Sequence, residues 1–195
     1  IRNHCGEWEV IVAELSPRNN KAATLYRLTE SLALGSVIVE IGCIRYDEET
    51  ASEDGWSTLY LASRAQRRGW EFHSIDKDLQ AIQTARSVLL KNVLPEARLH
   101  HADATEWLLG FDGVIDCLYM DGPDDPTINL NHLIAAYDKL RDLVIIDDTQ
   151  EYGGNRWGKG SMTLPYLESK GWIVVHYLTD PGYRMSCAMR SSRSR

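Results

Sequence analysis

The sequence has 195 residues, of which 44% are hydrophobic and 25% are charged, and its formal net charge is −7 at pH 7. This length and composition are typical of one globular domain with a single buried core, and they argue against a disordered chain. The acidic balance argues against duplex nucleic acid as a partner, because phosphate contacts need clustered Lys and Arg. The longest apolar runs are too short to span a bilayer. No signal peptide is visible, although a leader removed before Ile1 stays open.

The four cysteines are Cys5, Cys43, Cys117 and Cys187. They form no C-x-x-C pair, and no Cys/His spacing suits zinc. We interpret them as free thiols in a reducing cytoplasm. The sequence therefore predicts a cytoplasmic protein that acts on a small molecule, with no nucleic-acid or membrane partner, and it leaves a homodimer open.

Short apolar runs alternate with helical stretches along the chain, which is typical of an α/β fold built on a parallel sheet. The first predicted element is a helix over residues 21–34, where Ala and Leu recur at helical spacing. Strands are expected at 37–41, 71–75, 97–101, 114–120, 143–146, 172–178 and 184–189, and further helices at 56–68, 77–90, 127–140 and 161–170. The fourth and fifth strands are apolar almost throughout, as expected for strands covered on both faces.

The last two predicted strands are separated by a short turn that contains Asp180, Pro181 and Gly182. This is turn chemistry, so the two strands read as a hairpin and the last strand becomes antiparallel. We predict one α/β domain with a mostly parallel seven-stranded sheet, an antiparallel last strand and helices on both faces. Outside this core we expect an N-terminal arm, an acidic insertion and a frayed tail, at residues 1–18, 46–54 and 190–195.

The end of the first strand carries the most informative residues. Glu40 and Gly42 close this strand, and Gly55, Trp56 and Ser57 open the next helix. A glycine lets the backbone approach a ligand closely, and a helix start offers N–H groups to a carboxylate. A pyrophosphate loop would avoid a carboxylate here, whereas the ammonium group of a methionine moiety would attract one. Because the nicotinamide fingerprint G-x-G-x-x-G is also absent, the pattern favours S-adenosylmethionine over NAD.

Acidic residues also follow the second and third strands. Asp76, followed by Lys77, can accept two hydrogen bonds from a ribose diol. Asp103 can accept from the adenine amine, while the backbone of Ala104 donates to the ring. A single aspartate at a strand end is more often a helix N-cap. Here, however, an acidic residue stands at or after the end of each of the first five predicted strands. We therefore interpret the set as a nucleoside site.

Three further aspartates follow the fourth and fifth strands: Asp121, Asp147 and Asp148. Neighbouring strands end at the same edge of a sheet, so these carboxylates should converge. Oxygen-only ligands suit Mg²⁺, with water and substrate completing the octahedron. Loop capping, or an acidic pocket that holds no metal, is the alternative interpretation.

Taken together, these motifs resemble the class I S-adenosylmethionine-dependent methyltransferases. Within that superfamily the chain is similar to small-molecule O-methyltransferases of the catechol type and of the macrocin- and cephamycin-biosynthesis type. The resemblance covers roughly residues 20–178 and rests on the family motif E-x-G-x-x-x-G-x-S, on the ribose and adenine acids, and on the paired acidic motifs. It implies a Rossmann-like fold, Mg²⁺ held by Asp121, Asp147 and Asp148, a catalytic role for Asp121, and a cofactor held by Glu40, Gly42, Gly55, Trp56, Ser57, Asp76, Lys77, Asp103, Ala104 and Asp121.

The chain departs from this family at two places. The insertion at 46–54 is rich in Asp and Glu, and it reads either as a surface loop or as a lid that selects a cationic substrate. No general base is evident: Asp124 stands where the catechol type has a lysine. We expect Asp124 at a helix entry, His132 on the surface and Lys159 in solvent.

Methyl transfer needs little activation of the cofactor, because its sulfonium is already reactive. A hydroxyl acceptor must lose its proton, and a divalent cation lowers the pKa of a bound hydroxyl and orients it. The sequence therefore predicts metal-assisted methyl transfer to a hydroxyl of a small molecule. A metal-independent N- or carboxyl-methyltransferase, a non-catalytic S-adenosylmethionine-binding protein and an NAD(P)-dependent oxidoreductase are the alternatives.

Overall fold

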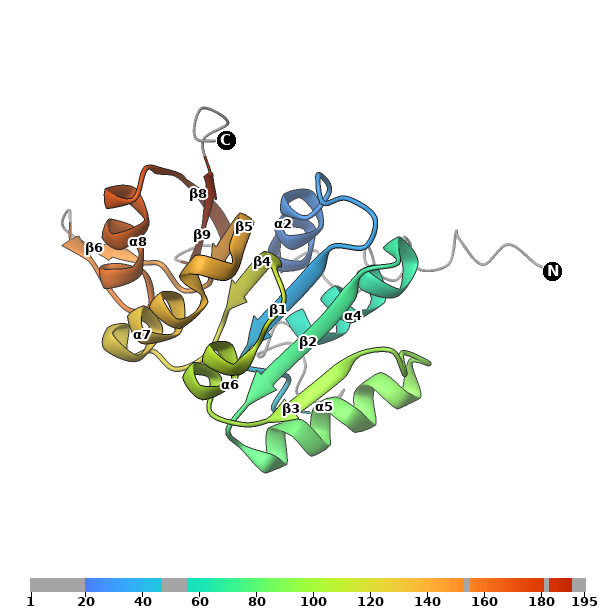
Figure 1. The fold of residues 1–195 in the computed structure, drawn as a ribbon. Coiled ribbons are helices and arrows are strands. Elements are labelled where there is room, and N and C mark those ends of the chain that lie inside the picture. Colours follow the sequence, from blue (N-terminus) through green and yellow to red (C-terminus); the bar gives the residue numbers. More distant parts are fainter. Residues whose placement is uncertain (1–19, 47–55, 153–154, 181–182, 191–195) are drawn as a thin grey trace.

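The computed structural model describes residues 20–46, 56–152, 155–180 and 183–190. These residues form a central sheet with a layer of helices on each face (Figure 1). None of their helices is long and apolar enough to cross a membrane. The sheet strands are β1 (Val37–Ile41), β2 (Glu71–Asp76), β3 (Arg98–His101), β4 (Ile115–Met120), β5 (Leu140–Ile146), β8 (Trp172–Asp180) and β9 (Tyr183–Arg190). The helices are α2 (Asn20–Leu28), α4 (Ser57–Arg68), α5 (Leu79–Lys91), α6 (Ala104–Gly110), α7 (Pro126–Ala136) and α8 (Gly160–Ser169).

The sheet has seven strands in the order β3-β2-β1-β4-β5-β9-β8. Strands β1 to β5 pair in parallel, whereas β9 runs antiparallel to both β5 and β8. The predicted sheet, its antiparallel last strand and the terminal hairpin are therefore confirmed. The chain winds outward in opposite directions from β1 and β4, and ligands bind beyond the carboxyl ends of strands at such a switch point.

Alternate residues of the central strands face two separate apolar cores. Cys117 and Tyr119 of β4 pack with α2, α4 and α5, while Leu118 and Met120 pack with α6, α7 and α8. Every residue of β4 is buried, as expected for a parallel strand covered on both faces. This burial explains why the strand is apolar in the sequence at every position except Asp116.

The first helix is shorter than predicted. It ends at Leu28 rather than continuing to residue 34, and the Thr29 hydroxyl donates to the carbonyl of Leu25 at 2.8 Å. Such a side-chain bond competes with the helical backbone pattern. Leu32, which continues the apolar spacing, is buried from a turn instead of from a helix.

Two elements were not predicted. Helix α6 is a short helix whose N-cap is Asp103, a residue that the sequence analysis read as a ligand. A two-stranded ribbon joins β6 (Glu151–Tyr152) to β7 (Asn155–Arg156). In addition, Arg190 pairs with Trp172 inside the sheet rather than belonging to the tail.

Several expectations fall outside the described residues. These are the N-terminal arm at 1–18, the insertion beyond Tyr46, the tail from 191, and the turn residues 181 and 182. Cys43, Cys117 and Cys187 are buried free thiols, as expected, and Cys5 lies outside the described part.

The backbone crosses very closely where β1 and β4 end. The Asp121 N–H donates to the Ile41 carbonyl at 2.9 Å, and the Gly42 N–H donates to Ile75 at 2.9 Å. Gly42 has a φ of +86°, and a Cβ at this position would lie 2.5 Å from the Asp121 carbonyl oxygen. Only glycine fits both the left-handed backbone and the contact.

We predict that Gly42→Ala destabilises the fold more than Gly171→Ala does. Gly171 has a similar φ of +80° but no heavy atom within 4 Å of its Cβ position, so its variant carries only the backbone strain, about 1 kcal/mol. Gly42→Ala adds a steric conflict worth about 2 kcal/mol more. Urea unfolding of both variants measures the difference, and equal losses would contradict the crossing argument.

Candidate functional site

A cleft of about 390 Å³ opens beyond the carboxyl ends of β1 to β4. It lies where the strand order reverses, as expected for this sheet class. Six residues predicted from the sequence line it: Gly42, Asp76, Lys77, Asp103, Ala104 and Asp121. The structure thus brings together residues that are up to 79 positions apart in the chain.

The two aspartates that were predicted to bind the nucleoside, Asp76 and Asp103, line the cleft and also hold backbone N–H groups. One oxygen of Asp76 accepts the Cys43 N–H at 3.1 Å, and the other accepts the Asp78 N–H at 2.8 Å. Asp103 accepts the Glu106 N–H at 3.1 Å as the N-cap of α6. A carboxylate offers about four lone pairs, so both can hold the loops in place and still accept from a ligand.

Glu40 lies beneath the cleft instead of lining it. Its side chain is fully buried, and its oxygens accept hydroxyl hydrogens from Ser57 at 2.7 Å and Ser74 at 2.6 Å. Burial raises the pKa of Glu40 to about 7, although these hydroxyl donors oppose the shift. In this structure Glu40 supports the start of α4 from below.

The start of α4 forms the narrow end of the site. Ser57, Gly42 and Arg45 border a small notch of about 20 Å³ beside the main cleft. Trp56 has a φ of +51° and buries its ring in the core below rather than in the cleft. Gly55, the remaining predicted contact here, lies outside the described residues.

The three predicted metal ligands do converge. Carboxylate oxygens of Asp121, Asp147 and Asp148 lie within 4.8 Å of one another. Asp148 has a φ of +49°, an unfavourable conformation for a residue other than glycine, of the kind that persists mainly where the surroundings impose it. Asp121 also borders the cleft, so the carboxylate cluster adjoins the predicted cofactor site.

Two lysines hold the carboxylate cluster. Lys21 Nζ lies 2.7 Å from Asp121 and 2.5 Å from Asp147. Lys159 Nζ lies 2.8 Å from the other oxygen of Asp121 and 3.0 Å from Asp148. The expectation of a solvated Lys159 is wrong, because its side chain is only 4% exposed.

The charged groups of this cluster shift one another's pKa values. Burial alone would raise the pKa of Asp121, but the ammonium groups of Lys21 and Lys159 outweigh it and hold that pKa low. Burial, with a contribution from Asp121, raises the pKa of Asp147 instead. Burial would lower the pKa of each lysine, but the carboxylates outweigh it and raise both lysine pKa values. Both lysines therefore stay cationic.

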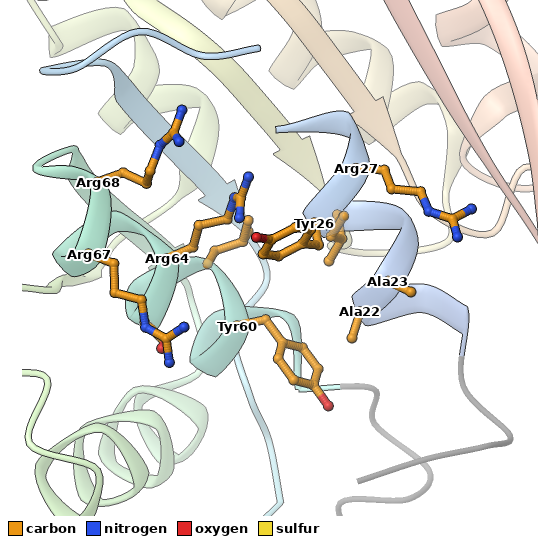
Figure 2. Close-up of a pocket in the computed structure, with 11 residues that line it drawn as sticks. Ala22, Ala23, Tyr26, Arg27, Tyr60, Arg64, Arg67 and Arg68 are labelled. Carbon is orange, nitrogen blue, oxygen red and sulfur yellow. The ribbon is translucent and has the colours of Figure 1, made fainter. Parts of the chain in front are cut away.

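The position of Lys21 depends on how α2 packs against α4. A hollow of about 360 Å³ runs between these helices, and Figure 2 shows Arg64 and Tyr26 side by side within it. The Arg64 guanidinium lies 3.8 Å from the Tyr26 ring centroid and also pairs with Glu30. These contacts hold α2 on α4 and so place its first turn beside Asp121.

The sequence alone did not place Lys21, Lys159 or His132 in the site. Nothing in the sequence links Lys21 to aspartates a hundred positions away. His132 was expected on the surface, but it is 4% exposed and lines the cleft. Helix α7 is apolar on most sides, so its inward face could not be read from periodicity. Asp124, by contrast, has an exposed side chain.

The sequence matches one known family. A family model described as a methyltransferase domain covers residues 49–149, just over half of the chain. No curated protein matches the sequence.

Solved structures share the fold at low identity. They include an rRNA methylase from Streptococcus thermophilus, with 13% identity, a TM-score of 0.59, and coverage of 86% of this chain and 94% of that one. A candidate methyltransferase from Streptococcus mutans in complex with SAH has 12% identity, a TM-score of 0.64, and coverage of 88% and 98%. A candidate O-methyltransferase from Klebsiella pneumoniae has 20% identity, a TM-score of 0.60, and coverage of 89% and 79%.

We predict that the stability of the wild type falls relative to that of Glu40→Gln as pH rises from about 4.5 to about 7. The carboxyl of Glu40 has a pKa of about 7 when folded, against an ordinary value of 4.5. The unfolded chain therefore loses this proton first, and rising pH favours unfolding across that window. The relative loss should be about 3 kcal/mol.

Urea unfolding of both proteins at pH 5 and pH 8 measures this effect. Glu96→Gln, which changes an exposed glutamate in the same way, should follow the wild type at both pH values. Parallel profiles for the wild type and Glu40→Gln would show that burial does not perturb this carboxyl.

Proposed function

The chain belongs to the methyltransferase domain family, and on that premise we propose that it transfers the methyl group of S-adenosylmethionine to a hydroxyl oxygen of a small molecule. The reaction would take place where the cofactor cleft meets the carboxylate cluster. Asp121 borders both, so it marks the point at which methyl donor and acceptor would meet.

The order of polar groups along the cleft is the observation that carries this proposal. Ser57 borders the notch at the start of α4, Asp76 follows β2, and Asp103 with Ala104 follows β3. S-adenosylmethionine needs groups for an amino acid, a ribose and an adenine in this spatial order. The helix start would receive the carboxylate, Asp76 the ribose diol and Asp103 the adenine amine.

The donor set of the carboxylate cluster fits a hard divalent cation. It consists of oxygen ligands alone, and their mutual distances suit a shared ion. Asp121, Asp147 and Asp148 would hold Mg²⁺, which would supply a lowered pKa for a bound acceptor hydroxyl. Three carboxylates stand against two ammonium groups, so the cluster keeps one net negative charge to attract a cation.

The chain's own residues would orient the acceptor and stabilise its oxyanion. Lys21 and Lys159 place fixed positive charge at the cluster, where an oxygen that has lost its proton would lie. Tyr119 donates its hydroxyl hydrogen to Asp121 at 3.1 Å, and it also lies 3.3 Å from Asp147. Preorganised charges of this kind lower the barrier without rearranging during the reaction.

A metal-independent methyltransferase is the second candidate, and the lysines favour it. Both oxygens of Asp121 already pair with ammonium groups, so a metal would have to displace Lys21 or Lys159 from them. If the lysines stay in place, they alone would lower the pKa of a bound hydroxyl. Metal binding therefore separates the two candidates.

We predict that S-adenosylhomocysteine binds the wild type and that Asp76→Ala weakens binding at least tenfold. The substitution removes two hydrogen bonds from a charged acceptor, each worth roughly 1.5–3 kcal/mol. Isothermal titration measures both affinities. Asp78→Ala is the matched control, because Asp78 caps α5 nearby but does not line the cleft. Failure of the wild type to bind would overturn the proposed function.

We predict that Mg²⁺ binds the wild type and that Asp147→Asn or Asp148→Asn abolishes this binding. Lys159→Gln should strengthen it, because the substitution frees one oxygen on each of two carboxylates. Isothermal titration with Mg²⁺, after removal of metals by a chelator, measures each effect. Asp124→Asn, an exposed neighbour, serves as the control. A wild type that binds no Mg²⁺ would favour the metal-independent candidate.

A further inference from the structure

His132 is a buried histidine in the wall of the cofactor cleft. It lies on α7, and only 4% of its surface is exposed. Its Nδ1 is buried and has no hydrogen-bond partner among the described residues. His132 also lines the cleft, so its other ring nitrogen, Nε2, is the one available to a ligand there.

The ring is suited to recognise an uncharged group. Burial lowers the pKa of His132, with Asp103 opposing and Lys77 adding to the shift. The ring is therefore neutral near pH 7, with one N–H donor and one acceptor nitrogen. An N–H group without an acceptor is costly to bury, and the buried Nδ1 has no hydrogen-bond partner among the described residues. We therefore place the proton on Nε2, where a ligand in the cleft can accept it.

The position along the cleft identifies the part of the ligand. The notch by Ser57 and the carboxylate of Asp76 occupy the amino-acid and ribose end of the site. His132 lies near Asp103, because α7 packs against α6 and the charge of Asp103 acts on the imidazole. Asp103 and Ala104 are the two residues assigned to the base, and both line the cleft with His132. In that assignment Asp103 takes the exocyclic amine of adenine and the Ala104 N–H takes the adjacent ring nitrogen. Of the acceptors beside the amine, N7 then remains without a donor.

We propose that His132 is a specificity-determining residue that donates a hydrogen bond to N7 of the adenine base of S-adenosylmethionine. This proposal rests on the proposed function, since it requires that cofactor to occupy the cleft. It gives α7 a direct part in cofactor recognition, in addition to the loops that follow β2 and β3.

Isothermal titration with two ligands tests the proposal. One is S-adenosylhomocysteine, and the other is its 7-deaza analogue, in which a C–H group replaces N7. The wild type should bind the analogue roughly five- to 150-fold more weakly, the range that one lost hydrogen bond with an unpaired buried donor implies. His132→Phe keeps an aromatic ring but not the donor, so it should bind both ligands with equal affinity.

A control variant and a second measurement distinguish a lost hydrogen bond from a folding defect. His176→Phe makes the same change at an exposed histidine on β8, and it should preserve the wild-type preference. In the wild type, the side-chain nitrogen resonances of His132 should report an Nε2–H tautomer and should shift when S-adenosylhomocysteine is added.

The outcomes separate this proposal from the one on which it rests. A wild type that binds neither ligand overturns the proposed function itself. If the wild type binds S-adenosylhomocysteine but does not prefer it over the 7-deaza analogue, or if His132→Phe keeps the full preference, the assignment of His132 is wrong while the cofactor class stands.

Discussion

The close approach of two backbone segments, after β1 and after β4, is the constraint on which the site depends. The Asp121 N–H meets the Ile41 carbonyl there, and Gly42 leaves no room for a side chain. This contact keeps the ends of the two central strands together at the switch point of the sheet. Because Asp121 itself makes that contact, the carboxylate cluster is held beside the cleft by backbone geometry as well as by side-chain contacts.

Electrostatic balance then determines what the site can hold. Three converging aspartates would repel one another strongly in a buried setting, and two lysines from distant parts of the chain offset most of that repulsion. One net negative charge remains at the cluster beside two fixed ammonium groups. Glu40 differs from these aspartates, because its partners are two hydroxyl groups instead of ammonium groups. Burial therefore raises its pKa and favours the neutral carboxyl.

The sequence correctly predicted the strands, which depend on local hydrophobic periodicity, and the residues that line the cleft at the strand ends. The central strands appear as apolar runs, and the residues after them, such as Asp76 and Asp103, lie where the strand-end rule places them. Contacts set by tertiary structure were not predictable. Lys21 reaches Asp121 only because α2 packs on α4, and the direction of His132 depends on which side of an apolar helix faces the sheet. Asp103 was predicted to bind a ligand, with a helix N-cap as the alternative, and it both caps α6 and lines the cleft.

The origin of each half of the site in the chain has an evolutionary consequence. The residues assigned to the cofactor lie mainly in one continuous stretch, from Gly42 to Ala104. The acceptor side is assembled from both flanks of that stretch: Lys21 precedes it, and Asp121 to Lys159 follow it. Most substitutions on the proposed acceptor side can therefore accumulate outside that stretch. Asp121 and His132 are the exceptions, because both also line the cleft. This layout would let the proposed acceptor side change while the proposed methyl donor stays the same.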